Sequence, residues 1–176
     1  MMALSLYDAV IPSNRQILGA MAGLIDKAAA FAQAQGRDAA ALIDARLASD
    51  MLPFGYQVKS CANHSAGAWA GVQAGSFSPS RSMWPTDFAG LRALVEEADA
   101  HLAAIDRAAF DATAEQPTDF VMGEMRLPFT AGQFLLSFSQ PNFYFHATTA
   151  YAILRKEGVK LGKADFLGRL RLRPAG

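Results

Sequence analysis

Apolar residues recur every three or four positions along four long stretches of the sequence, which is the spacing of a helix with one buried face. The first stretch predicts a helix over residues 10–35, with Pro12 in its first turn and Gly36 after its end. The second stretch predicts a helix over residues 53–73. The third, over about residues 87–105, has Thr86 as its expected N-cap and gives the most regular pattern in the chain.

The fourth stretch begins near Thr130 and ends at Gly158, and its buried face is expected to include Phe145. Pro141 interrupts this stretch, because proline removes one backbone hydrogen bond and its ring clashes with the carbonyl four residues before it, that of Ser137. The segment is therefore either kinked or split into two helices, with Pro141 opening the second.

Three shorter segments complete the pattern. Residues 39–48 predict a short helix. Residues 119–128 predict a small two-stranded hairpin, or an irregular insertion, with Gly123 and Glu124 in the turn. Residues 161–168 predict an irregular tail anchored by Phe166 and Leu167. Together these elements predict an all-α fold, a four-helix bundle formed by one domain of residues 1–176. Two of the connections are long, so crossover connections are as compatible with the pattern as an up-down-up-down order.

Composition narrows the classes of protein and partner. Hydrophobic residues make up 52% of the chain and charged residues 18%, which is typical of a globular protein. Sixteen basic and sixteen acidic residues cancel, so we expect neither nucleic acid nor an anionic membrane as the partner. No run of about 18 apolar residues predicts a membrane span. The single cysteine, Cys61, excludes an intrachain disulfide, and we expect a cytoplasmic protein.

Candidate chemistry gathers on the second and fourth helices. Asn142 and His146 are one helical turn apart within an apolar, aromatic segment, and the second helix carries His64 beside Gln57 and Cys61. The chain has three histidines, so few combinations exist. Two histidines from different helices with one further donor suit zinc, nickel or ferrous iron. Asn142 is a poor ligand, because its amide oxygen is neutral.

The same residues also allow an interpretation without metal. His64 and His146 would then hydrogen-bond to each other, to Gln57 or to a buried water. Cys61 and His64 are a candidate nucleophilic pair, although a small buried thiol that fills the core fits the pattern better. We expect His101 to be a solvated residue at the edge of the third helix. The polar pocket between the second and fourth helices is expected to comprise Gln57, Cys61, Asn142 and Thr149 around the two histidines.

Several motifs resemble those of a known family. They are the segments 5–8, 46–53 and 57–58, the long segment 135–155 that contains Pro-Asn-Phe-Tyr-Phe-His, and the segment 162–168 with the sequence Gly-Lys-Ala-Asp-Phe-Leu-Gly. The chain is identified by them as similar to domain of unknown function 1993, in the DinB/YfiT-like superfamily of four-helix bundles. The resemblance implies a divalent metal held by three histidines. Two of these positions match His64 and His146, and the third falls on Asn142.

Two functions follow from the residues and the resemblance together. The first is metal-assisted transfer or hydrolysis of a small molecule, with His64 and His146 holding zinc, nickel or iron. The second is a non-catalytic, metal-free module that binds a small ligand or has a role in stress. Whether the protein is an enzyme stays open at this point. The resemblance and the surplus of aromatic residues predict a homodimer.

Overall fold

The computed structural model describes residues 4–173 and is mostly helical, with a small three-stranded sheet. The elements follow in chain order as α1 (Leu6–Gln35), α2 (Ala39–Ile43), α3 (Phe54–Ala62), the π-helical segment η1 (Asn63–Gly67), α4 (Ala68–Ala74), β1 (Ser76–Phe77), α5 (Phe88–Ala103), α6 (Arg107–Asp111), β2 (Pro117–Met122), β3 (Met125–Thr130), α7 (Ala131–Gln133), the π-helical segment η2 (Phe134–Ser139), α8 (Gln140–Lys156) and α9 (Lys163–Leu167).

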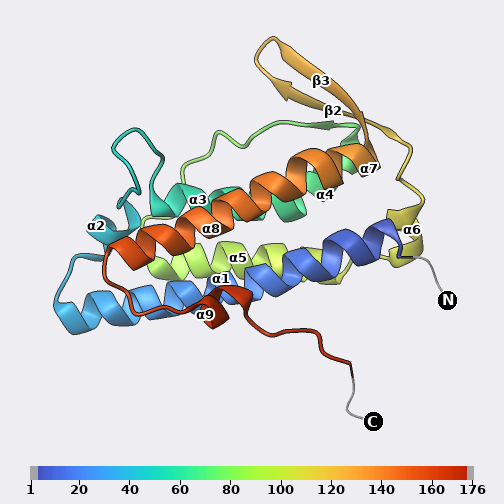
Figure 1. The fold of residues 1–176 in the computed structure, drawn as a ribbon. Helices are drawn as coiled ribbons and strands as arrows, with labels where there is room; N and C mark the ends of the chain where they lie inside the picture. Colours follow the sequence, from blue (N-terminus) through green and yellow to red (C-terminus); the bar gives the residue numbers. More distant parts are fainter. Residues whose placement is uncertain (1–3, 174–176) are drawn as a thin grey trace.

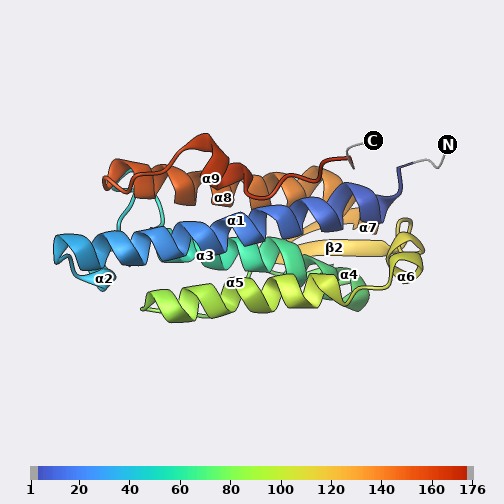
Figure 2. The ribbon, with the colours of Figure 1, turned by 90° about the horizontal axis from the view of Figure 1, so that it is seen from below.

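Four long helical stretches lie side by side and enclose the core (Figures 1 and 2). They are α1, the continuous run α3–η1–α4, α5, and the continuous run α7–η2–α8. Helix α1 packs along α5, and α3 packs against both α8 and α5. The β2–β3 hairpin projects at one end of the molecule, next to α4 and α7 (Figure 1). The contact between α3 and α8 brings the candidate site residues together.

Helix α1 begins four residues earlier than the periodicity predicts, and Pro12 lies inside the helix rather than in its first turn. The hydroxyl of Ser5 caps the helix by accepting from the backbone N–H of Asp8 at 3.3 Å. By length and apolar composition α1 would be able to cross a membrane, and it is the one such helix among the described residues. Its side chains contribute to the core between the other helices, as those of a core helix in a soluble-type fold do.

The second long stretch spans residues 54–74, as predicted, but five of its residues form a π turn. A π turn has i→i+5 hydrogen bonds, so it holds one residue more than a turn of α-helix. The third stretch begins with Asp87 as N-cap, not Thr86, since the Asp87 carboxylate accepts from the backbone N–H of Gly90 at 2.6 Å. The predicted helix over 39–48 is shorter than expected and ends at Ile43.

The last stretch begins as predicted, with Thr130 in a capping box with Gln133. Pro141 lies in the first turn of α8 and follows the six-residue segment η2, so a π segment resolves the expected clash. Phe145 was predicted to be buried, and this was wrong, since the residue is 56% exposed. Because η2 changes the helical register, residues on either side of it do not share the face that a continuous α-helix would give them.

The predicted hairpin is confirmed, with Gly123 at φ 61° in the turn between β2 and β3. The sequence did not predict a third strand. Strand β1 pairs in parallel with β2, with Phe77 opposite Phe120. The sheet therefore ties the end of α4 to the hairpin. In the tail, which was expected to be irregular, residues Lys163–Leu167 form the short helix α9 against α1.

Candidate functional site

The rings of His64 and His146 face each other across the contact between η1 and α8. Their centroids are 5.7 Å apart, and the ring planes differ by 18°. The π segment carries His64, which is 7% exposed, whereas His146 on α8 is half-buried. Both histidines that the sequence singled out thus lie in one site.

Gln57 holds the ring of His146 in one orientation and one tautomer. Its Nε2 donates to the carbonyl of Leu52 at 2.8 Å, which leaves its Oε1 as an acceptor for His146 Nδ1 at 2.7 Å. Because Oε1 only accepts, His146 Nδ1 carries the proton. The lone pair is therefore on Nε2, which makes no hydrogen bond to any described residue.

The two π segments meet at this site. A π turn leaves a helix carbonyl without its usual partner four residues later. The hydroxyl of Ser139, at the end of η2, donates to the main-chain carbonyl of His64 in η1 at 2.9 Å, and both residues are buried. The hydroxyl of Ser65 donates to the carbonyl of Cys61 at 2.7 Å. Side-chain hydroxyls thus satisfy carbonyls in and beside the irregular turn that carries His64.

Asn142 and Thr149 use their side chains on their own helix. Asn142 Nδ2 donates to the carbonyl of Phe138 at 2.7 Å, and the hydroxyl of Thr149 donates to the carbonyl of Phe145 at 2.8 Å. Each bond reaches back four residues. Asn142 therefore supports the backbone at the junction of η2 and α8, where Pro141 lacks an N–H.

Aromatic rings surround the histidine pair. Phe77 and Phe138 lie 5.3 and 6.1 Å from the His64 ring, measured between centroids. Tyr56 and Phe145 lie 5.9 and 5.3 Å from the His146 ring. Phe77 comes from the two-residue strand β1, and Tyr56 from α3, one residue before Gln57. Neither was predicted to be part of the site, because neither belongs to the apolar and polar stripes of the predicted helices.

Burial makes both imidazoles poor bases. Loss of water lowers the pKa of His64 to about 4, with a further lowering by the nearby charge that His146 would carry. Burial also lowers the pKa of His146 to about 4. Both rings are therefore neutral at pH 7, and each offers one N–H donor and one lone pair.

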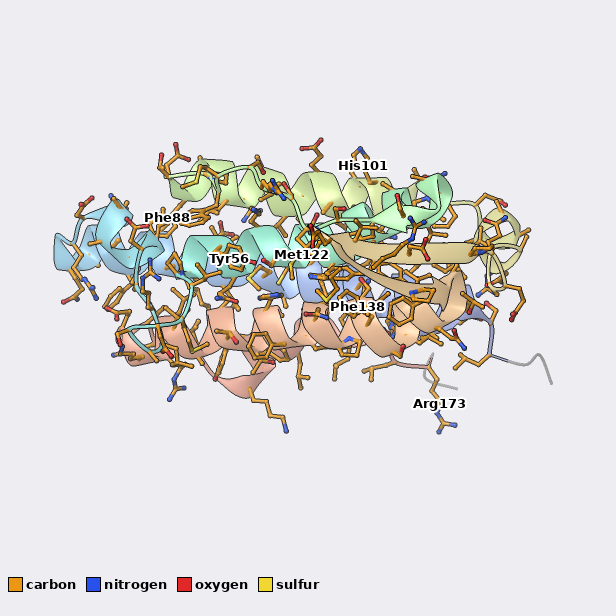
Figure 3. The ribbon with its side chains drawn as sticks, turned by 90° about the horizontal axis from the view of Figure 1, so that it is seen from above. Tyr56, Phe88, His101, Met122, Phe138 and Arg173 are labelled. Carbon is orange, nitrogen blue, oxygen red and sulfur yellow. The ribbon has the colours of Figure 1, made fainter. Side chains whose placement is uncertain are left out.

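The thiol of Cys61 is fully buried, and it contacts the carbonyl of Phe143 at 3.9 Å. Burial raises the pKa of this thiol well above its usual range. The thiolate that a nucleophile requires is thus disfavoured, and Cys61 fills the core between α3 and α8. His101 lies apart from the pair, exposed on α5 at the edge of the molecule opposite α8 (Figure 3).

The donors in this site fall short of the metal centre that the resemblance implies. A catalytic zinc site has three protein ligands. Here there are two imidazoles, and Asn142, at the position of the third ligand, is a neutral carboxamide that donates to the Phe138 carbonyl of its own helix. Within residues 4–173 no three His, Cys, Asp or Glu side chains gather as a metal site would require. The residues present therefore do not fit a three-ligand metal centre.

Fold and site together define a mostly helical protein with a neutral histidine pair where two π segments meet. Residues 6–167 match the family described as "Domain of unknown function (DUF1993)". The chain belongs to this family, which confirms the resemblance seen in the sequence. It is also similar to a solved structure described as a DinB family member protein from Shewanella denitrificans, with 29% identity and a TM-score of 0.81. That similarity covers 97% of this chain and 96% of the other. No curated protein matches the sequence.

Proposed function

We propose that this chain is a single DinB/YfiT-like four-helix-bundle domain that binds a small polar molecule at the His64–His146 pair without a resident metal. One observation carries the proposal. His64 Nδ1 is buried and has no hydrogen-bond partner among the described residues. Buried polar atoms of native proteins almost always have a partner, so a bound molecule is the natural source of the missing one.

The chemistry of the pair defines the class of molecule. His146 offers its Nε2 lone pair, which accepts a hydrogen bond from an O–H or N–H group. Tyr56 and Phe145 add apolar surface beside His146, and Phe138 adds it beside His64. The preferred ligand is therefore small, with a hydroxyl or amide group beside an apolar or aromatic part. A molecule of this kind reaches the half-buried His146 before the buried His64.

A second candidate function is binding of an exchangeable divalent cation, completed by donors of the small molecule itself. Two observations favour it: the free lone pair on Nε2 of neutral His146, and the buried Nδ1 of His64, which has no hydrogen-bond partner among the described residues. The metal-assisted transfer or hydrolysis that the resemblance implies belongs to this candidate. The metal would be zinc, nickel or iron.

The two candidates separate in one set of measurements. Protein purified without an affinity tag is dialysed against zinc, nickel, ferrous iron or manganese, then against metal-free buffer, and analysed for bound metal. In parallel, a collection of small hydroxyl- and amide-bearing aromatic compounds is screened by NMR in metal-free buffer. The wild type is compared with His146→Ala, and His101→Gln is the control outside the site.

We expect no metal near one equivalent per chain, together with compounds that bind the wild type and His101→Gln but not His146→Ala. A stoichiometric metal in the wild type that His146→Ala loses would establish the second candidate and overturn the metal-free one. Compounds that bind all three proteins equally would exclude the histidine pair as the site.

A further inference from the structure

A separate cavity of about 240 Å³ lies on the other side of the α3–η1 run, between it and α5. The loop between β1 and α5 closes one side of it. Neither His64 nor His146 lines this cavity. The lining residues are Lys59, Ala62, Asn63, Ala66, Gly67, Ser80, Ser82, Leu94, Glu97, Ala98 and His101.

Lys59 supplies a buried positive charge on one wall. The residue is 7% exposed, and its Nζ lies 2.7 Å from the carbonyl oxygens of both Ser80 and Ser82. The ring centroid of Tyr56 is 5.4 Å away. Within residues 4–173 no carboxylate lies within 4.0 Å of this nitrogen. Burial lowers the pKa of Lys59, which is the expected effect of a charge without a counter-ion.

Glu97 supplies the opposite charge on the facing wall. It lies on α5, is exposed at the rim and forms no ion pair with a basic group of the described residues, whereas its neighbour Glu96 pairs with Arg92 at 3.0 Å. Lys59 and Glu97 therefore line one cavity without pairing with each other. A buried charge is costly unless a partner compensates it.

Small side chains keep the space between these charges open. Ala62, Ala66 and Ala98 line the cavity together with Gly67. An added Cβ at Gly67 would come within 3.0 Å of Asn63 Oδ1, so a larger residue there would crowd the Asn63 amide. The side chain of Asn63 forms no hydrogen bond to any described residue. Its amide offers a donor and an acceptor to a molecule in the cavity.

We propose that this cavity binds a small zwitterion of the amino-acid class, with its carboxylate at Lys59 and its ammonium at Glu97. Two of the three N–H groups of Lys59 donate to the loop carbonyls. The ligand carboxylate accepts a hydrogen bond from the third and is the counter-ion of the buried charge. The ammonium gives Glu97 a partner that no described side chain supplies. This site is independent of the histidine pair, since the two lie on different faces of the α3–η1 run.

The ligands themselves test the requirement for both charges. The standard amino acids are titrated into the full chain at millimolar concentration, and backbone amide shifts of residues 59–67 and 97–101 are followed by NMR. The best binder is then compared with its N-acetyl derivative, which lacks the ammonium, and with its amide, which lacks the carboxylate. We expect each blocked form to bind at least about tenfold more weakly.

Matched variants test the residues. Glu97→Gln, at an exposed position, is expected to weaken binding of the amino acid at least about tenfold. The amide form, which lacks the carboxylate, should not bind to this variant. Glu96→Gln, one residue away and outside the cavity, should leave affinity unchanged, as should His146→Ala. Lys59→Met should abolish binding, with a circular dichroism spectrum and melting curve recorded to show that it folds. Absence of saturable binding by any amino acid, or equal affinity in Glu97→Gln and the wild type, would overturn the proposal.

Discussion

The hydroxyl of Ser139 donates to the main-chain carbonyl of His64 across 2.9 Å, and so joins the two π segments of this fold. The bond connects residues 75 positions apart in the sequence. It fixes the backbone that carries one histidine relative to the helix that carries the other. The histidine pair thus depends on a contact that includes neither imidazole ring.

Ser139→Ala is therefore expected to destabilise the protein. The variant leaves a buried carbonyl without its side-chain donor, which costs about 1–3 kcal/mol of unfolding free energy. Urea denaturation at pH 7 measures this loss. Ser137→Ala is the control, because the exposed hydroxyl of Ser137 donates only to the carbonyl of Gln133 in its own helix. That change should stay within about 0.5 kcal/mol. Equal losses in the two variants would contradict the role given to Ser139.

The pH dependence of stability should report the two buried histidines. Their pKa values are about 4 in the folded chain and 6.5 in a model peptide, so the unfolded chain binds protons that the folded chain does not. Stability is then complete above about pH 6.5 and falls as the pH decreases toward 4. Between pH 7 and 5.5 each histidine should contribute a loss of about 1 kcal/mol.

Urea denaturation at several pH values in this range gives the slope of the unfolding free energy against pH. His64→Asn should reduce this slope by roughly half, since one of the two groups with a lowered pKa is removed. His101→Gln, which replaces the exposed histidine on α5, is the comparison. A slope in His64→Asn as steep as that of the wild type would show that His64 does not remain neutral in the folded chain.

Asn142→His should create a three-histidine metal site. The substitution places a third imidazole one helical turn before His146 and completes a three-histidine set. It also removes the hydrogen bond to the Phe138 carbonyl, at a cost of about 1 kcal/mol. Dialysis against zinc and then metal-free buffer, followed by elemental analysis, should find close to one zinc per chain in the variant only. Asn142→Ala controls for loss of the amide, and equal zinc in wild type and Asn142→His would refute the prediction.

We also predict a homodimer. Leu136 and Phe145 on the last long stretch are 45% and 56% exposed, which places large apolar side chains at the surface. Sedimentation at micromolar concentration should give about twice the chain mass of 18.8 kDa. Leu136→Ser and Phe145→Ser test whether this surface forms the contact, by a shift toward the monomer. A wild-type mass of one chain would count against the dimer itself.

Hydrophobic periodicity was sufficient for most of the fold. The four long stretches, the start of the last one near Thr130 and the turn at Gly123 all follow from local rules. Strand β1 does not, because two residues carry no pattern and form a strand only by pairing with β2. The exposure of Phe145 could not be predicted from the sequence either, since a constant helical period cannot indicate that η2 shifts the register.

His64, His146 and Gln57 were predicted to lie together, but the aromatic residues around them were not. The ring of Phe77 reaches His64 because β1 folds back onto α4, where an added Cβ at Gly71 would lie 2.7 Å from Phe77 Cβ. Such close approach is visible only in three dimensions. Lys59 lies on the predicted second helix, but its burial depends on a loop whose path the sequence does not specify.

The π segment around His64 also has a consequence for insertions and deletions. A π turn contains one residue more than the α-helix needs, and one residue corresponds to about 100° of rotation. Deleting one residue within Asn63–Gly67 would let Phe54–Ala74 close as a regular helix, and the parts before and after the deletion would keep their present faces, because the wide turn already absorbs the extra residue. Gln57 would keep its relation to α8, whereas the wide turn that carries His64 would be lost. A scan of single substitutions would leave this dependence unseen, whereas loss of one codon would reveal it.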